Sequence, residues 1–174
     1  MKAVIMAGGF GTRLRPLTAN IPKPMVPMAA RPVMEHIVRL LKKHKIKDIT
    51  AILYFQSEQI KSYFDNGKRW GVDIKYITAK ADFGTAGSVK NAQKNLDSRF
   101  IVISGDVLTD FDLSEAIDFH ARRKAAATIV LTRVENPLAY GIVVTSKSGK
   151  ITRFLEKPGW GQVFSDTVNT GIYI

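Results

Sequence analysis

Glycines followed closely by basic residues near the N-terminus form the segment whose residue types and spacing best suit chemistry. Residues 8–16 read GGFGTRLRP and follow the first apolar run. Glycines directly after a strand permit positive φ and let backbone N–H groups approach a phosphate closely. The Walker loop and the dinucleotide fingerprint are excluded, because no Gly-Lys-Ser/Thr follows and Leu14 stands where the third glycine would be. Arg13, Arg15 and, further along the loop, Lys23 favour a polyphosphate over a tight glycine turn with solvated arginines.

A lysine enclosed by prolines is the second chemical feature. The segment Pro22-Lys23-Pro24 continues into Met25-Val26-Pro27. Prolines fix φ and stiffen the backbone, so the ammonium of Lys23 is held in place instead of being left mobile. A rigid surface connector is the alternative, but a loop of this length inside a compact domain is more often functional.

A carboxylate at the end of an apolar strand is the third feature. Residues 100–103 read FIVI and lead into Ser104-Gly105-Asp106. A carboxylate beyond the carboxyl edge of a sheet that faces a triphosphate is a sensible Mg²⁺ ligand, because Mg²⁺ prefers oxygen and needs few protein carboxylates. Without the upstream glycine loop, a turn-forming Gly-Asp pair would be the simpler interpretation.

The elements that must position these residues alternate between short apolar strands and amphipathic helices. Strands are predicted at 4–6, 49–55, 73–78, 100–104, 128–134, 141–145, 151–155 and 168–174. Helices are predicted from Pro32 as the first helical residue, around Ile60 and Phe64, at 88–96, and after Asp112 as N-cap. Strand–helix alternation with unbroken apolar strands indicates a mainly parallel sheet that is covered on both faces. The strand-rich final third indicates that the sheet is mixed, so we expect a Rossmann-like, three-layer α/β/α fold.

Composition excludes several classes of protein. The chain has 174 residues, a formal net charge of +11 and no cysteine. The length fits one domain, and 45% hydrophobic with 24% charged residues excludes wholesale disorder. The absence of cysteine excludes disulfides, thiolate zinc sites and cysteine catalysis, and it suits a cytoplasmic location. No apolar run approaches the ~18–20 residues that cross a bilayer, so no membrane partner is expected.

The excess of positive charge leaves nucleic acid as an alternative partner. Arg39, Lys42, Lys43, Lys45 and Lys47 cluster on and after one amphipathic helix. Because no aromatic residues are interleaved with them, a solvated helix face explains them better, and no nucleic-acid partner is expected. The three histidines, at positions 36, 44 and 120, show no metal-ligand spacing, and no Gly-x-Ser-x-Gly elbow is present.

Taken together, the first motifs resemble the signature of the sugar-1-phosphate nucleotidyltransferases, the nucleotide-sugar pyrophosphorylases. The match extends over residues 6–18 and then Pro22-Lys23-Pro24. The resemblance implies that the phosphate of a sugar 1-phosphate attacks the α-phosphorus of a nucleoside triphosphate and releases pyrophosphate. It implies catalytic roles for Arg13, Lys23 and Asp106, with Asp106 also binding Mg²⁺. It implies a nucleotide-binding loop made of Ala7, Gly8, Gly9, Gly11 and Thr12.

The resemblance continues to the nucleobase and sugar sides. Gly84, Thr85, Ala86 and Gly87, which we expect in a loop, match the segment that contacts the base in such enzymes. Their Gly-Thr-Ala-Gly form is most like the guanylyl, mannose-1-phosphate branch, which points to GTP and GDP-mannose. The sugar-phosphate side is expected to comprise Tyr140, Gly141, Glu156, Lys157, Asn169 and Gly171. A plain glycine/threonine helix cap at 84–87 is the alternative.

The resemblance has one departure. Members of the family usually carry a second metal-binding Asp nearer the C-terminus, and nothing after Asp118 fits well. We therefore expect residues 1–174 to be a nucleotidyltransferase catalytic domain truncated at its C-terminus, with any homo-oligomer contacts in segments beyond residue 174. Thymidylyl, uridylyl and adenylyl transfer to glucose 1-phosphate stays open, as does a regulatory homologue that binds nucleotide sugar without chemistry.

Overall fold

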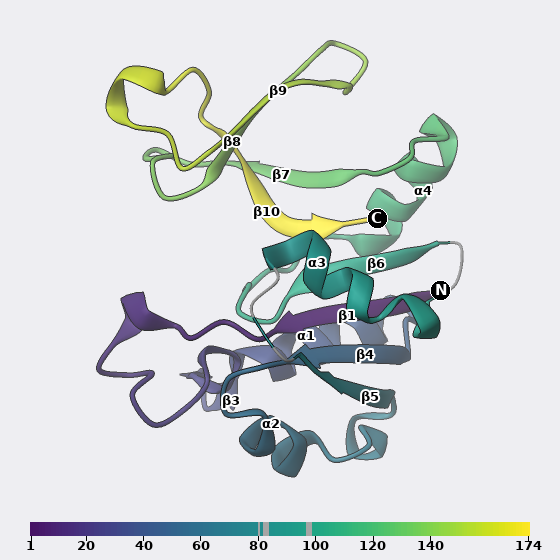
Figure 1. Ribbon diagram of the computed structural model, residues 1–174. Helices are drawn as coiled ribbons and strands as arrows, with labels where there is room; N and C mark the ends of the chain where they lie inside the picture. Colours follow the sequence, from purple (N-terminus) through teal and green to yellow (C-terminus); the bar gives the residue numbers. More distant parts are fainter. Residues whose placement is uncertain (80, 82–83, 97–98) are drawn as a thin grey trace.

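The computed structural model describes residues 1–79, 81, 84–96 and 99–174, and an eight-stranded sheet runs through it (Figure 1). Its strands are β1 (Lys2–Ala7), β4 (Asp48–Leu53), β5 (Asp73–Thr78), β6 (Phe100–Ser104), β7 (Ile129–Arg133), β8 (Gly141–Thr145), β9 (Ile151–Glu156) and β10 (Thr167–Tyr173). Their order is β5-β4-β1-β6-β10-β8-β9, and β7 also pairs with β10. Strands β5, β4, β1 and β6 are parallel, whereas β10 is antiparallel to β6, β7 and β8. The predicted mixed sheet is confirmed.

Helices cover both faces of this sheet and make it the middle of three layers. The helices are α1 (Val33–Lys43), α2 (Ser57–Phe64), α3 (Gly84–Asn91) and α4 (Leu113–Arg123). In Figure 1, α3 crosses in front of the strands and α1 lies behind them. Ala3 and Ile5 of β1 belong to the larger core with α1, α2 and α4, whereas Val4 belongs to a smaller core under α3. This alternation follows from the two-residue period of a strand, and it confirms the α/β/α prediction.

The entry to α1 differs slightly from the prediction. Pro32 is not the first helical residue but the residue before it, since α1 begins at Val33. Pro32 instead pairs with Pro27 in a small antiparallel hairpin of β2 (Pro27–Met28) and β3 (Arg31–Pro32). Sequence reasoning missed this hairpin because its turn consists of Ala29 and Ala30, both at positive φ, rather than the glycine or asparagine that usually marks such a turn.

The largest error in the predicted elements concerns α3. Residues 84–87 are its first turn and not a loop, and the α-helix ends at Asn91 before a 3₁₀ turn at Gln93–Asn95. Glycine in a helix is less favourable than alanine by roughly 1 kcal/mol, which made a loop the better prediction. In the structure this turn lies beside the end of β1, with Thr85 and Met6 lining one cavity, so tertiary packing overrides the local propensity.

The start of α4 agrees with its prediction. The side chain of Asp112 accepts hydrogen bonds from the backbone N–H groups of Ser114 (2.9 Å) and Glu115 (3.1 Å). These bonds, with the one from Glu115 the larger cause, lower the pKa of Asp112 below its ordinary value. Asp112 is therefore the N-cap residue of α4, as predicted.

A buried carboxylate on α1 is held by hydrogen bonds within the core, and its contribution to stability can be measured. Glu35 is 4% exposed and accepts hydrogen bonds from Tyr63 Oη and Arg39 Nε, each at 2.7 Å. Burial alone would raise the pKa of Glu35, but these hydrogen bonds outweigh it and hold the pKa below the ordinary 4.5. A lowered pKa means that the charged form stabilises the fold above pH 4.5, and that this stabilisation is lost as the pH falls through the folded-state pKa.

We expect Glu35→Gln to lower the free energy of unfolding at pH 7 by about 1–3 kcal/mol, because a buried hydrogen-bonded charge is lost. Urea unfolding at pH 7 and at successively lower pH measures the free energy of unfolding. The difference in this free energy between the variant and the unsubstituted protein should become smaller below pH 4.5. Glu135→Gln, at an exposed loop position, is the matched control and should change little. A loss that stays the same at every pH would contradict the charge-based account.

No helix among the described residues is long and apolar enough to cross a bilayer.

Candidate active site

The carboxyl ends of β1 and β6 lie next to each other, which brings the glycine loop and Asp106 to one edge of the sheet. In this parallel pair Met6 lies opposite Ser104. The backbone N–H of Gly105 donates to Met6 O at 2.7 Å, and that of Val107 to Ser104 O at 3.3 Å. These bonds fix the turn that carries Asp106 directly after β6. Ligands of open α/β sheets bind at this edge.

The glycine loop is folded against the segment that carries Lys23. Gly11 has a φ of +64°, and a Cβ there would lie 3.0 Å from Thr18 Cγ2 and 3.1 Å from Lys23 Cβ. The buried Thr18 donates its hydroxyl to Gly11 O at 2.7 Å. The positive φ and the short distances to the side chains of Thr18 and Lys23 therefore both favour glycine at this position. The contact holds the Lys23 backbone against the loop that follows β1.

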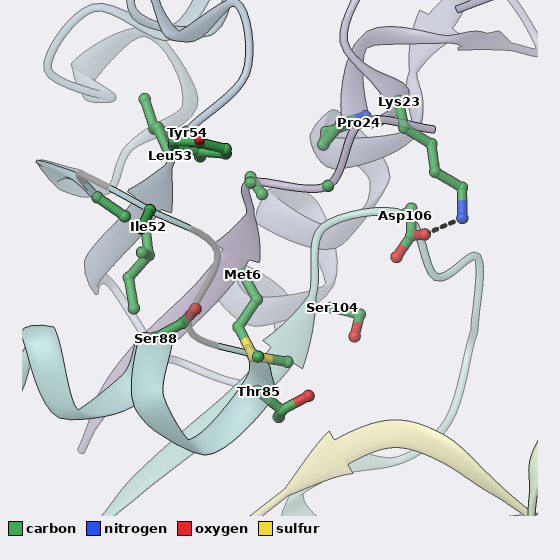
Figure 2. Close-up of a pocket in the computed structure, with 16 residues that line it drawn as sticks. Met6, Lys23, Pro24, Ile52, Leu53, Tyr54, Thr85, Ser88, Ser104 and Asp106 are labelled. Atoms are coloured by element: carbon green, nitrogen blue, oxygen red, sulfur yellow. Dashed lines mark ion pairs between the residues drawn. The ribbon is translucent and has the colours of Figure 1, made fainter. Parts of the chain in front are cut away.

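Lys23 projects from a rigid turn toward Asp106. It begins the 3₁₀ turn η2 (Lys23–Met25), and its proline neighbours Pro22 and Pro24 are both buried. The Nζ of Lys23 forms an ion pair with Oδ2 of Asp106, which Figure 2 shows as a dashed line. The two side chains are 35% and 29% exposed, so the pair faces solvent-accessible space rather than the core. The structure thus brings together the cation and the carboxylate that the sequence singled out.

A cavity of about 270 Å³ opens between the glycine loop and the first turn of α3 (Figure 2). We call it the glycine-loop cavity. Its walls include backbone from the loop after β1, hydroxyls of α3, the side chain of Tyr54 and the Lys23–Asp106 pair. The predicted site residues that line it are Ala7, Gly8, Gly9, Lys23, Gly84, Thr85 and Asp106.

A second, wider cavity of about 840 Å³ lies between β10, the end of β9 and the loop after β6. We call it the β10 cavity. The predicted site residues that line it are Tyr140, Gly141, Glu156, Asn169, Gly171 and Asp106. Among the described residues, only Ser104 and Asp106 line both cavities. The two cavities therefore meet at the end of β6.

Several predicted residues lie outside both cavities. Arg13 is exposed in the 3₁₀ turn η1 (Thr12–Leu14), so its role toward a phosphate stays a prediction. Gly11 packs against Thr18 and Lys23 and does not line the glycine-loop cavity. Thr12 lies in the same turn as Arg13, and Ala86 and Gly87 lie in the first turn of α3 without lining the cavity.

Lys157 does not line the β10 cavity. Its Nζ lies 3.5 Å from Oε1 of Glu156, and its backbone N–H donates to Tyr140 O at 3.0 Å. Its φ of +43° turns the chain away at the end of β9. Its contact with a sugar phosphate therefore stays a prediction that requires a different side-chain position.

Asn169 lines the β10 cavity but uses its carboxamide within the protein. Its Nδ2 donates to Tyr173 Oη at 2.7 Å, and its Oδ1 accepts from the Gly171 backbone N–H at 2.9 Å. The pairing of β10 with β7 is irregular between Asn169 and Tyr173. Asn169 thus shapes this bulge, and direct contacts from it to sugar hydroxyls stay a prediction.

A magnesium site at Asp106 is compatible with the donors present. Mg²⁺ is usually held by one or two carboxylates, with water and substrate phosphates completing the coordination. The Asp106 carboxylate is partly exposed at the point where the two cavities meet. No group of three or more metal-ligating side chains is found within residues 1–79, 81, 84–96 and 99–174. Asp106 therefore fits an ion shared with a bound phosphate rather than one enclosed by protein.

Tyr54 and Ser104 are two of the cavity residues that were not predicted as site residues. Tyr54 follows β4 and lines the glycine-loop cavity, and its ring packs edge-on against Phe10 with centroids 5.4 Å apart. Ser104 lines both cavities from the last position of β6. The signal that could have found both is positional, because each stands where an apolar strand of the parallel sheet ends.

Comparisons with known proteins place the chain in a family. The profile of the family described as nucleotidyl transferase matches residues 2–174. The chain is 42% identical over 189 residues to a UTP–glucose-1-phosphate uridylyltransferase from Synechocystis sp., covering 100% of this chain and 48% of that protein. It is 40% identical over 180 residues to the catalytic subunit beta of mannose-1-phosphate guanylyltransferase from Xenopus tropicalis, covering 100% of this chain and 49% of that protein.

A solved structure gives the same result for the fold. A putative glucose-1-phosphate thymidylyltransferase from Bacillus anthracis, in complex with a sucrose, superposes with a TM-score of 0.91 at 29% identity. The superposition covers 99% of this chain and 70% of that one. The chain spans about half the length of the curated relatives that it matches. With the family profile matching nearly every residue, the chain belongs to the nucleotidyl transferase family, among the sugar-1-phosphate nucleotidyltransferases.

Proposed function

We propose that the protein transfers a nucleotidyl group from a nucleoside triphosphate to a sugar 1-phosphate and releases pyrophosphate. The observation that carries this proposal is that two cavities meet at Asp106 and Ser104. The triphosphate occupies the glycine-loop cavity, and the sugar 1-phosphate occupies the β10 cavity. A phosphate oxygen of the sugar phosphate then faces the α-phosphorus where the cavities join.

The residues at this junction suit an in-line displacement. A new bond forms between the sugar-phosphate oxygen and the α-phosphorus, the bond from the α-phosphorus to the β-phosphate bridging oxygen breaks, and pyrophosphate leaves. Such a reaction requires positioning and positive charge rather than a nucleophilic side chain. Lys23, held by buried prolines at the edge of the glycine-loop cavity, supplies a fixed ammonium for the phosphate oxygens. The backbone of Gly8 and Gly9 lines the same cavity and leaves room for phosphates.

Mg²⁺ is the cofactor that we propose for this site, with Asp106 as its protein ligand. When bound, the ion would neutralise negative charge on the substrate phosphates. In the free protein Asp106 is paired with Lys23. Substrate phosphates would give Lys23 a new partner and leave the carboxylate of Asp106 available.

For the substrate pair, we propose GTP and mannose 1-phosphate as the first to test. The Gly-Thr-Ala-Gly segment of α3 and the 40% identity to a relative named as a mannose-1-phosphate guanylyltransferase support this pair. UTP and glucose 1-phosphate form the second candidate, because a relative named as a UTP–glucose-1-phosphate uridylyltransferase is 42% identical.

The test is a matrix of the four ribonucleoside triphosphates and dTTP against mannose 1-phosphate and glucose 1-phosphate, with Mg²⁺ and the full-length protein. Pyrophosphate release should appear with one pair well above the others, and it should require both substrates. Reactions that lack the sugar phosphate serve as the control for simple triphosphate hydrolysis. Binding of a nucleotide sugar without turnover of any pair would instead support the regulatory alternative and overturn the enzymatic proposal.

A further inference from the structure

Ser104 occupies a position that the proposed roles of Lys23 and Asp106 leave unexplained. It is the last residue of β6, and it shares with Asp106 the property of lining both cavities. In Figure 2 it lies between Thr85 of the glycine-loop cavity and Asp106. A side chain at this junction lies close to any group that is transferred between ligands bound in the two cavities.

The hydroxyl of Ser104 is available to a ligand. Among the described residues, Ser104 Oγ has no hydrogen-bond partner, whereas its backbone is held by the turn to Val107. Gly171 keeps this hydroxyl uncovered, because a Cβ at Gly171 would lie 2.7 Å from Ser104 Oγ. The φ of +78° at Gly171 also favours glycine there, and Asn169 fixes the turn by accepting the Gly171 backbone N–H.

We infer that the Ser104 hydroxyl donates a hydrogen bond to a phosphate oxygen at the reacting centre, an assignment that rests on the proposed function. In the proposed reaction the α-phosphate loses pyrophosphate, which is bound in the glycine-loop cavity, and bonds to the sugar phosphate, which is bound in the β10 cavity. The α-phosphate must therefore lie where the two cavities meet. A serine hydroxyl can donate one hydrogen bond, and a charged acceptor makes that bond stronger. Ser104 takes no covalent part, and its proton stays on Oγ throughout.

This role differs from those of the other hydroxyls nearby. Thr85 and Ser88 line only the glycine-loop cavity, so they can touch only the nucleotide. Thr132 and Thr170 line only the β10 cavity, and the hydroxyl of Thr170 already donates to Val130 O at 2.8 Å. Of these hydroxyl-bearing residues, Ser104 alone lines both cavities.

Ser104→Ala tests the inference, because it removes the hydroxyl and leaves the Cβ in place. We expect kcat to fall about 10–100-fold, as for a lost hydrogen bond to a charged group, with a smaller change in either KM. Ser88→Ala should instead raise the KM for the nucleotide and leave the KM for the sugar phosphate unchanged. Ser62→Ala, at an exposed position of α2, is the control for serine removal as such. Thermal unfolding of each variant shows whether the fold is retained.

A binding measurement separates this inference from the proposed function. Calorimetry with GDP-mannose and with UDP-glucose should show about 10-fold weaker binding to Ser104→Ala than to the unsubstituted protein. If the unsubstituted protein binds one of them in a Ser104-dependent way but turns over no substrate pair, the proposed reaction fails and the Ser104 contact stands. If Ser104→Ala retains both turnover and binding, or if neither nucleotide sugar binds the unsubstituted protein, the inference is overturned.

Discussion

Lys23→Ala should lower kcat for pyrophosphate release by about 10²–10³-fold, the loss typical of removing one preorganised charge-stabilising donor. The size of the effect follows from how the residue is held. Pro22 and Pro24 are buried on either side, so the ammonium is positioned by the fold and does not have to be ordered by the substrate. No neighbouring lysine lines the glycine-loop cavity among the described residues, so none replaces it.

The matched control for this prediction is Lys61→Ala. Lys61 also pairs with a carboxylate, Glu58, at 2.7 Å, but it lies on α2 and lines neither cavity. It should leave kcat unchanged. Steady-state rates with the best substrate pair provide the measurement, and a Lys23→Ala rate within a few-fold of the unsubstituted protein would remove Lys23 from the reacting centre.

Arg13→Ala extends the same experiment to a residue that the structure leaves outside the cavities. The sequence motif predicts a loss as large as that for Lys23, yet Arg13 is exposed in η1. A comparable loss would support a role for Arg13 in the reaction. An unchanged rate would restrict the phosphate-binding part of the motif to Lys23 and the loop backbone.

The parts of the fold that sequence reasoning found are those whose signal is local and repeated. Continuous apolar runs such as residues 100–103 mark strands buried on both faces, and Asp112 before an apolar period marks a helix start. Because loops after parallel strands gather at one edge of the sheet, the segment after β1 that carries Lys23 and the turn after β6 that carries Asp106 meet there.

The parts that sequence reasoning missed depend on contacts between distant segments. The first turn of α3 is helical through packing beside β1, against the preference of Gly84 and Gly87. The availability of the Ser104 hydroxyl depends on the glycine at position 171, which reaches it only through the antiparallel pairing of β10 with β6. No short-range pattern in the sequence contains either fact.

The position of the charges also changes what the net charge of +11 means. Lys23 is the one lysine or arginine, among the described residues, that lines the glycine-loop cavity or the β10 cavity. Other cations, such as Lys42 and Lys43 of α1, are exposed and line neither of these cavities. The proposed substrate site is therefore not strongly basic, since Asp106 pairs with its lysine. The proposed binding of phosphates therefore depends on the position of individual groups such as Lys23 rather than on an overall positive potential.

Asp106→Asn should lower kcat/KM by about 10³-fold, because the amide keeps the shape of the side chain but loses the charge that a Mg²⁺ ligand provides. The fold should tolerate this change. The Lys23–Asp106 pair is about one-third exposed, and ion pairs of this kind contribute at most about 1 kcal/mol to stability. A large loss of activity with a small shift in the thermal midpoint is therefore the expected combination.

The experiment that completes this test measures metal binding as well as rate. Mn²⁺ is added with the nucleotide, and bound Mn²⁺ is quantified by electron paramagnetic resonance. The unsubstituted protein is compared with Asp106→Asn and with the control Asp118→Asn, which changes an exposed carboxylate of α4. Asp106→Asn should bind less metal together with the nucleotide, whereas Asp118→Asn should match the unsubstituted protein. If Asp106→Asn loses activity but keeps full metal binding, the carboxylate acts by holding Lys23 rather than by holding an ion. That result would remain consistent with the geometry of the pair and would move the metal ligand to another residue.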